Sequence, residues 1–274
     1  MRKKVQLMGI INLTPDSFHA PSRVHGAEAV LERAGKMLRE GADILDFGAA
    51  STRPGAAEVG AEEEWKRLET ALTAVREAFP EARISVDSYH SEVVLRCYDK
   101  IGPFLVNDIS GGQADPAMLD TVGRLSLPYV AMHTRGTPRT MQSLTDYPDG
   151  VVAELIRYFE AFAEKAERAH IEDWILDPGF GFAKTREQNW ELLRRIGELR
   201  RFGRPLLVGI SRKSMLGSSP ENALQATLNA ERLALEQGAD ILRVHDVAET
   251  KRLIQQGPDC PRDGRWESSA AERD

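Results

Sequence analysis

This chain has few cysteines, no long apolar run and no cluster of basic residues. The two cysteines, Cys97 and Cys260, lie far apart and outside any CxxC pair, which fits a reducing compartment and excludes zinc-finger spacing. No apolar run approaches the roughly 18 to 20 residues that a membrane span needs. The 36 Lys and Arg against 42 Asp and Glu leave a net charge of −6, which argues against nucleic-acid binding. We therefore expect a soluble cytoplasmic protein whose partners are small molecules.

The composition supports a full-sized packed core, because 42% of the 274 residues are hydrophobic and 28% are charged. Short apolar runs alternate along the chain with stretches of three- and four-residue apolar spacing, which is typical of helices. Such alternation of strands and helices favours parallel strand pairing. The eight predicted strands comprise residues 6–11, 44–47, 84–86, 104–106, 129–132, 174–176, 206–210 and 241–244.

A repeated segment indicates equivalent structural units. The sequence Gly-Ala-Asp-Ile-Leu at 41–45 recurs at 238–242, in both places between a helical stretch and a predicted strand. Glycine at that point is typical of the left-handed residue that ends a helix. We predict that residues 1–256 form one domain of the α/β class, a (β/α)₈ TIM barrel, with a doubly wound open sheet as the alternative. Residues 257–274 are predicted to form a poorly ordered tail.

A polar residue follows every predicted strand at its carboxyl end. In a TIM barrel these ends meet at one rim, where active sites lie, and charged groups buried there need a partner or a ligand. Structural alternatives are a helix N-cap for Asp108 and Ser88, a surface ion pair for Arg212 and core hydrogen bonding for His133. The residues of this predicted rim are Asn12, Asp46, Asp87, Asn107, Asp108, His133, Asp177, Ser211–Ser214, Arg243 and His245.

Part of this rim has the chemistry to recognise a flat heterocycle. Asp177 can accept two N–H groups, Asn107 offers a donor and an acceptor, and Lys213 donates to a ring carbonyl. A pterin presents such an edge, and the glycines within 179–181 allow a close approach of the backbone. The alternative is a structural ion pair between Asp177 and Lys213.

A second part of the rim suits an anion. Ser211, Arg243 and His245 follow the last two predicted strands, where TIM barrels often bind phosphate. Asn12 can ligate a Mg²⁺ ion that shares phosphate oxygens.

Two loops after early strands, at 14–23 and 49–56, are long and rich in turn residues. Loops of this kind in a compact domain are usually lids or mobile segments, and plain connectors are the alternative.

Six motifs occur in a fixed order along the chain. They are GIINLTPDSF at 9–18, STRPG at 51–55, SVD at 85–87, NDI at 107–109, DPGFGF at 177–182, and SRKS at 211–214 with RVHD at 243–246. On these motifs the chain resembles the dihydropteroate synthases, a family of pterin-binding TIM barrels, from Met8 to about Thr250.

The resemblance implies a transferase of folate biosynthesis that is a sulfonamide target. Its reaction condenses 6-hydroxymethyl-7,8-dihydropterin pyrophosphate with p-aminobenzoate, which yields 7,8-dihydropteroate and pyrophosphate. The pyrophosphate departs ahead of attack and leaves a pterin-methyl cation. The resemblance also implies a homodimer and a Mg²⁺ cofactor ligated by Asn12.

The resemblance further assigns residues to the parts of the reaction. The pterin would be bound by Asp87, Asn107, Met132, Asp177, Lys213 and Arg243. The pyrophosphate would be bound by Asn12, Arg53, Arg243 and His245. The p-aminobenzoate side would comprise Thr52, Pro54, Phe182, Lys184 and Ser214. The catalytic residues would be Asp87, Lys213, Arg53 and Asp46.

Two departures from the family pattern lie in the predicted loops. His19–Ser22 replaces the usual Ser-Asp-Gly-Gly, and Ala49–Ala50 replaces the usual Gly-Glu, which removes a carboxylate. These changes affect turnover more directly than pterin binding. They motivate one alternative, a non-catalytic pterin-binding paralogue. A second alternative is a methyltetrahydrofolate-binding methyltransferase barrel, which has little use for the motif at 51–54.

Overall fold

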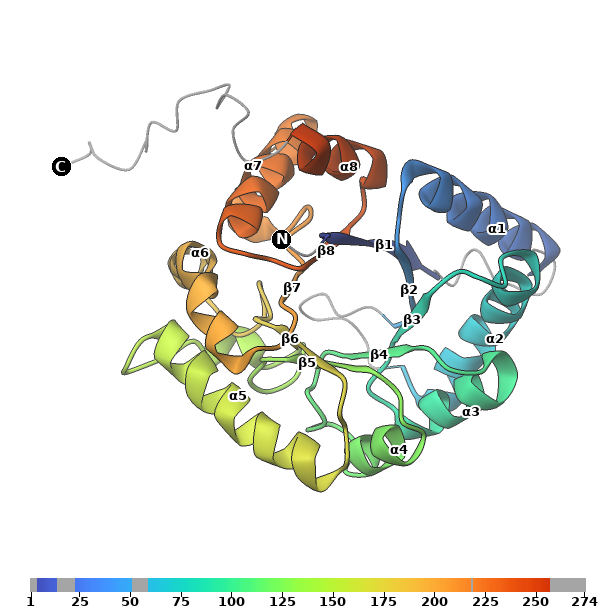
Figure 1. Ribbon diagram of the computed structural model, residues 1–274, viewed down its shortest axis with the longest axis horizontal. Coiled ribbons are helices and arrows are strands. Elements are labelled where there is room, and N and C mark those ends of the chain that lie inside the picture. The colour runs from blue at the N-terminus through green and yellow to red at the C-terminus, as the bar shows by residue number, and fades with distance from the viewer. Residues whose placement is uncertain (1–3, 14–22, 51–58, 218, 257–274) are drawn as a thin grey trace.

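The chain folds into a closed ring of parallel strands enclosed by helices (Figure 1). The computed structural model describes residues 4–13, 23–50, 59–217 and 219–256. The predicted tail at 257–274 and most of the two predicted loops, at 14–22 and 51–58, lie outside the described residues. The ring of parallel strands confirms the predicted TIM barrel. The poor order of the tail and the lid role of the two loops stay predictions.

The strands pair in the order β6-β5-β4-β3-β2-β1-β8-β7. An isolated parallel bridge between Leu176 and Leu206 joins the two ends of this order, and the Leu176 N–H donates to the Pro205 carbonyl at 2.9 Å. The ring is thereby closed, so the doubly wound open sheet is wrong. The strands are β1 (Gln6–Asn12), β2 (Ile44–Gly48), β3 (Ile84–Asp87), β4 (Leu105–Asp108), β5 (Tyr129–Met132), β6 (Trp174–Asp177), β7 (Leu207–Val208) and β8 (Ile241–Val244).

Helices connect successive strands and pack against the outside of the barrel. Within the described ranges, none of them is long and apolar enough to cross a bilayer. The α-helices are α1 (Arg23–Glu40), α2 (Ala61–Ala78), α3 (Ser91–Ile101), α4 (Met118–Arg124), α5 (Val151–Arg168), α6 (Arg186–Arg195), α7 (Ala223–Glu236) and α8 (Val247–Gln256). The 3₁₀ helices are η3 (Met141–Ser143), η4 (Ile196–Phe202), η5 (Ser214–Leu216) and η6 (Pro220–Asn222).

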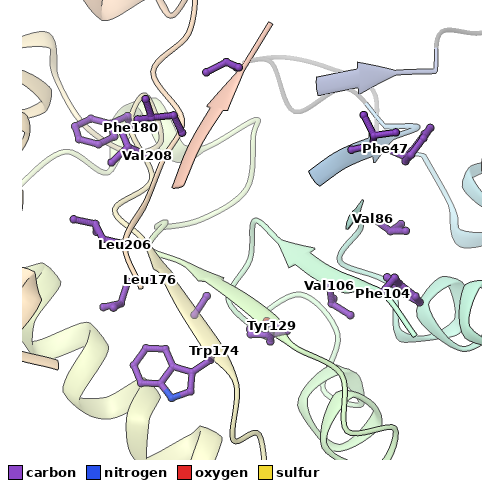
Figure 2. Close-up of a cluster of buried hydrophobic side chains, with 14 of the residues drawn as sticks. Phe47, Val86, Phe104, Val106, Tyr129, Trp174, Leu176, Phe180, Leu206 and Val208 are labelled. Carbon is purple, nitrogen blue, oxygen red and sulfur yellow. The ribbon is translucent and has the colours of Figure 1, made fainter. Parts of the chain in front are cut away.

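Helix α5 illustrates how the sequence pattern becomes packing. Its residues Val152, Leu155, Phe159 and Phe162 are all buried, which confirms the predicted apolar face. Residues with this spacing lie on one side of a helix, so the whole stripe faces the sheet. Figure 2 shows the strand side of the same layer, where Val106, Leu176 and Val208 point outward toward the helices.

Residues of the strands alternate between the outer layer and the barrel interior, because successive strand side chains point to opposite faces. A separate apolar cluster fills the interior and consists of Met8, Ile44, Leu105, Val130, Leu207 and Ile241, with Ile175 packed against it. The residues two positions later along each strand also face inward, one layer closer to the carboxyl ends of the strands. This upper layer is therefore where the polar residues predicted for the rim are located.

The repeated Gly-Ala-Asp-Ile-Leu segments have the same structure in both places. Gly41 (φ 99°) and Gly238 (φ 92°) have the left-handed backbone predicted for the end of a helix. The aspartate of each copy accepts a backbone N–H from a neighbouring strand region: Asp43 from Leu7 at 3.0 Å, and Asp240 from Leu206 at 2.9 Å. Each copy thus ties the amino-terminal ends of adjacent strands together.

The inner apolar layer generates a test of barrel packing. Leu207→Ala removes a fully buried interior side chain, so we expect it to lower the free energy of unfolding by about 2 to 5 kcal/mol. Leu224→Ala, at a position that is 37% exposed on α7, is the matched control and should cost less than about 1 kcal/mol. Urea denaturation of both variants measures this difference. Equal losses would contradict the assignment of Leu207 to the core.

Candidate active site

Four strands bring an ionic cluster together at the carboxyl end of the barrel. The Arg243 guanidinium of β8 donates through Nε to Asp46 Oδ2 of β2 at 2.6 Å and through Nη2 to Asp87 Oδ2 of β3 at 2.8 Å. Asn107 of β4 donates through Nδ2 to both oxygens of Asp46, at 3.3 and 3.2 Å. The predicted convergence of these residues on one rim is therefore observed.

Burial of this cluster sets the proton affinity of Asp87. Burial raises the pKa of Asp87 to about 7, the Arg243 guanidinium opposes that rise, and the Asp46 carboxylate adds to it. One cation thus lies between two carboxylates in a desolvated place. Near neutral pH, Asp87 can hold either charge state, and a cation or an N–H donor of a ligand at this place favours the ionised one.

A tight turn after β6 brings Asp177 and Lys213 to the same rim. Asp177 Oδ1 accepts the Gly179 N–H at 2.8 Å. Gly179 (φ 67°) lies so close to β5 that a Cβ at this position would be 2.0 Å from the His133 carbonyl oxygen. Only glycine fits there, which accounts for the glycine in the Asp-Pro-Gly motif.

Lys213 crosses over this turn. Its Nζ donates to the Phe180 carbonyl oxygen and lies 4.9 Å from the centre of the Phe182 ring. Burial lowers the pKa of Lys213 to about 8, while the Asp177 carboxylate opposes that change. Burial also raises the pKa of Asp177, and the Lys213 ammonium opposes it. Among the ion pairs of the described residues, Asp177 with Lys213 is not one, so the structural ion-pair alternative is wrong.

The position of Lys184 requires a correction. The side chain, expected on the p-aminobenzoate side, is 3% exposed and points into the protein. Its Nζ lies 3.0 Å from His133 Nδ1 and donates to the carbonyl oxygens of Gly179 and Phe182, each at 3.0 Å. These partners occupy the ammonium group, so direct contact with p-aminobenzoate is wrong for this arrangement. His133 is accordingly a buried, hydrogen-bonded core residue.

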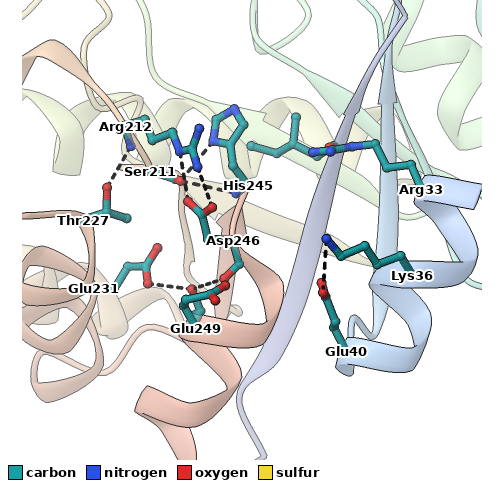
Figure 3. A network of polar contacts seen from close by, with 12 residues as sticks. Arg33, Lys36, Glu40, Ser211, Arg212, Thr227, Glu231, His245, Asp246 and Glu249 are labelled. Carbon is teal, nitrogen blue, oxygen red and sulfur yellow. Dashed lines mark hydrogen bonds and ion pairs between the residues drawn. The ribbon is translucent and has the colours of Figure 1, made fainter. Parts of the chain in front are cut away.

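The loops after β7 and β8 form the predicted anion side (Figure 3). The Ser211 hydroxyl accepts the His245 backbone N–H at 3.3 Å and lies 3.0 Å from His245 Nδ1. Arg212 binds the Asp246 carboxylate with two hydrogen bonds, of 2.5 and 3.0 Å. Arg212 is therefore a surface ion-pair partner, as the structural alternative predicted. This pair links the two loops that carry Ser211 and His245.

Glu231, a buried acidic residue of α7, is hydrogen-bonded to the helix that follows the loop after β8. The Glu231 side chain of α7 is 1% exposed, and its Oε2 lies 2.9 Å from the Thr250 hydroxyl of α8. Burial raises the pKa of Glu231 to about 8, and the hydrogen bond from Thr250 opposes that rise. The Thr250 hydroxyl is the donor to Glu231 Oε2, and it also lies within hydrogen-bond distance of the Asp246 carbonyl oxygen, at 3.0 Å.

Asp108 has a structural role. Its carboxylate accepts the N–H groups of Ser110 and Gly112 at 2.7 and 2.8 Å and the Tyr129 hydroxyl at 2.6 Å. Helix α4 begins only at Met118, so Asp108 caps a turn and the helix N-cap alternative is wrong in detail.

Ser88 has a comparable local role. The Ser88 hydroxyl accepts the N–H of His90, which is the N-cap residue of α3, at 3.2 Å. Sequence reasoning missed the pair of buried Glu64 with His90, at 2.6 Å, because no local pattern links α2 to the loop after β3.

The remaining predicted site residues differ in their surroundings. Met132 is buried at the end of β5, Phe182 is half-buried, and Ser214 and Asn12 are exposed. A Cβ at Gly48 would lie 3.8 Å from Asn12 Oδ1 and 3.5 Å from Asp87 Cβ, so a glycine there keeps the space between these two side chains open. Thr52, Arg53 and Pro54 lie outside the described residues. Among the residues that the structure covers, no group of three or more His, Cys, Asp or Glu side chains could hold a metal ion.

Comparisons with known proteins identify the family of this chain. The model of the family described as "Pterin binding enzyme" matches residues 8–245. A dihydropteroate synthase of Escherichia coli is 43% identical over 255 residues, which cover 91% of this chain and 89% of that protein. The folic acid synthesis protein fol1 of Pneumocystis carinii is 41% identical, but this chain spans only 35% of its length.

A solved structure is also similar. The dihydropteroate synthase of Xanthomonas albilineans with 4-aminobenzoic acid superimposes with a TM-score of 0.83 at 36% identity, covering 94% of this chain and 95% of that one.

The environment of His245 generates a titration test. Burial and the cations of Arg212 and Arg243 lower the pKa of His245 to about 4. The unfolded chain therefore binds more protons between about pH 4 and pH 6.5, and this part of the stability is lost as the pH falls through that window. We expect NMR titration to give a pKa near 4 for the His245 imidazole. Its signals are identified by their absence in the His245→Gln variant. A midpoint near 6.5 would contradict the half-buried position beside two arginine cations.

Proposed function

The chain belongs to the family of pterin binding enzymes, and we propose that it condenses 6-hydroxymethyl-7,8-dihydropterin pyrophosphate with p-aminobenzoate, which releases 7,8-dihydropteroate and pyrophosphate. It is then a transferase of folate biosynthesis. The observation that carries the proposal is the cluster of Arg243 between Asp46 and Asp87, with Asn107 against Asp46. This cluster and the neighbouring Asp177 combine pterin-edge chemistry with a cation for phosphate on one barrel rim.

The pterin occupies the deeper, more buried part of the rim in this proposal. Asp177 and Asn107 hydrogen-bond the guanidine-like edge of the ring, and Lys213 donates to the ring carbonyl. Support comes from the burial of Asp177 and Asn107, since buried polar groups gain from a ligand that satisfies them. Met132 and the Arg243 guanidinium contact the ring, and Asp87 lies beside it.

The pyrophosphate is bound nearer the solvent, by His245, Arg243 and Asn12, with Arg53 from the second loop. The low pKa of His245 makes it a neutral hydrogen-bond partner there, and Arg243 provides the charge. Asn12 suits a Mg²⁺ ion, because Mg²⁺ takes oxygen ligands and is commonly held by one or two protein groups together with substrate phosphates. When bound, Mg²⁺ neutralises phosphate charge.

The p-aminobenzoate lies on the side of Phe182 and Ser214, with Thr52 and Pro54 from the second loop. The half-buried Phe182 ring offers an apolar contact to the arene, and exposed Ser214 offers a hydroxyl to the carboxylate. Lys184 is left out of this set because its ammonium group is occupied by internal partners.

The reaction needs charge stabilisation and orientation rather than a covalent enzyme intermediate. The bond between the pterin methylene carbon and the pyrophosphate oxygen breaks, and the oxygen keeps the electron pair. The arylamine nitrogen then forms a bond to that carbon and loses a proton. Asp87, with Asp46 behind it, stabilises the positive charge on the pterin, while Arg243 and His245 stabilise the departing anion. Holding both substrates together supplies the orientation.

Two further expectations stay predictions. A homodimer is expected from the family resemblance and can be measured by light scattering. A cytoplasmic location is expected from the composition. The methyltransferase alternative is disfavoured because the curated relatives are named dihydropteroate synthase or folic acid synthesis protein.

The activity itself is tested by a coupled pyrophosphate-release assay. We expect release that depends on both substrates, falls when Mg²⁺ is removed by chelation and returns when Mg²⁺ is restored, and is inhibited competitively by a sulfonamide. Calorimetric binding of the pterin pyrophosphate without any release would instead favour the non-catalytic paralogue. Release without Mg²⁺ dependence would remove the metal from the proposal and leave the reaction.

The pterin orientation is tested with Asp177→Asn. The amide replaces one acceptor by a donor that faces the N–H groups of the ligand. We therefore expect the affinity for pterin pyrophosphate to fall about 10- to 100-fold, which corresponds to a loss of about 1 to 3 kcal/mol in binding free energy. Asp173→Asn is the matched control, because Asp173 is exposed just before the amino-terminal end of the same strand. Calorimetry of both variants decides, and unchanged affinity in Asp177→Asn would refute the orientation.

A further inference from the structure

We propose that Lys184 and His133 are positioning residues that hold the turn after β6 in the shape needed for pterin binding. This proposal rests on the proposed function, because it explains how the residues of that site are kept in place. It concerns two side chains that touch no substrate in the scheme above.

The Lys184 ammonium group has a complete set of acceptors. An ammonium carries three N–H donors, and three acceptors lie 3.0 Å from Nζ: the Gly179 and Phe182 carbonyl oxygens and His133 Nδ1. The His133 carbonyl oxygen is more distant, at 3.5 Å. Burial lowers the pKa of Lys184 to about 7, and the Asp177 carboxylate opposes that change. In its charged form every N–H donor of the group has an acceptor, so the group is specifically oriented, since any other position would leave donors without partners.

The two carbonyl groups that Lys184 binds, those of Gly179 and Phe182, belong to the turn that also contacts Asp177 and Lys213. Gly179 donates its N–H to Asp177, and its carbonyl is bound by Lys184. The carbonyl of Phe180, between the two groups held by Lys184, accepts from Lys213. Lys184 therefore fixes the backbone that orients both Asp177 and Lys213, together with the Phe182 ring.

The turn has an unusual backbone that explains why it needs such a hold. Gly179 (φ 67°), Gly181 (φ 80°) and Ala183 (φ 49°) all have left-handed backbone angles. Ala183 is not a glycine, and a non-glycine residue in this region is strained unless its surroundings hold it. The Ala183 carbonyl accepts the Tyr147 hydroxyl at 2.8 Å, next to the Lys184 anchor.

His133 completes the arrangement from the neighbouring strand. To accept from Lys184 through Nδ1, His133 must be neutral and carry its proton on Nε2. Burial lowers the pKa of His133 well below its usual value, and the Lys184 ammonium adds to that change. With Lys184 charged, the ring accepts from it through Nδ1, and this contact anchors the turn to the end of β5.

Lys184→Met keeps an unbranched side chain of similar volume but removes the N–H donors. It leaves the Gly179 and Phe182 carbonyl oxygens and His133 Nδ1 without the partner that they have in the wild type. We therefore expect the thermal unfolding midpoint to fall and the turn to lose its shape, and the position of the increased hydrogen exchange separates a local change in the turn from a general loss of stability.

The experiment combines binding with a measurement that needs no ligand. The variants are Lys184→Met, His133→Phe, which removes the acceptor, and His133→Asn, which places an amide oxygen where Nδ1 lies. Lys165→Met, at an exposed position on α5, is the control. Calorimetry measures pterin pyrophosphate affinity, and hydrogen exchange with mass spectrometry measures protection of residues 177–184.

We expect Lys184→Met and His133→Phe to weaken pterin pyrophosphate binding at least tenfold and to increase exchange in 177–184, with His133→Asn and Lys165→Met within threefold of wild type. Wild-type affinity and wild-type exchange in Lys184→Met would overturn the proposal. If Lys184→Met does not fold, the contrast between His133→Asn and His133→Phe decides, and equal behaviour of these two refutes it. If the wild-type protein itself does not bind the pterin, the proposed function fails, and the exchange data still decide whether Lys184 holds the turn.

Discussion

The two-residue alternation of side chains in a closed parallel barrel is the constraint on which the rest of this structure depends. The isolated parallel bridge between Leu176 and Leu206 closes the ring. Alternate side chains of every strand therefore point toward a single barrel axis. One layer, with Val130 and Leu207, is apolar and solid. The next layer carries Asp46 and Arg243, which are 197 positions apart in the sequence. Arg243 Nε nevertheless lies 2.6 Å from Asp46 Oδ2.

Burial in that upper layer changes the chemistry of ordinary side chains. Asp87 acquires a pKa of about 7 and Lys213 one of about 8 because both are taken out of water, and the opposite charges nearby only partly offset that cost. A site of this kind is poised to exchange its internal ion pairs for contacts with a ligand of matching charge. The Arg212 and Asp246 pair contributes differently, since it joins the loops after β7 and β8 from the surface.

Most of the fold could be predicted from local patterns. Runs such as 129–132 and 241–244 became strands at the expected residues, and the glycine of each repeated segment ended a helix. The errors are instructive. The helix N-cap alternative for Asp108 is wrong in detail, because Asp108 caps a turn well before α4, and the length of the intervening loop is not encoded in the residue itself. The family resemblance assigned Lys184 to the p-aminobenzoate side, whereas its ammonium group is buried against His133 and two carbonyl oxygens, because burial is set by packing and not by motif position.

The sequence by itself determined the barrel, the polar residue at each strand end and the family, because periodicity, turn chemistry and motif order are all properties of neighbouring residues. Only the tertiary structure decided which polar groups bind each other and which remain available to a ligand. Arg243 binds Asp46 and Asp87. Lys213 donates to the Phe180 carbonyl oxygen, and the buried Lys184 contacts His133. These choices depend on distances across the barrel and on burial, which are set by packing of segments far apart in the chain.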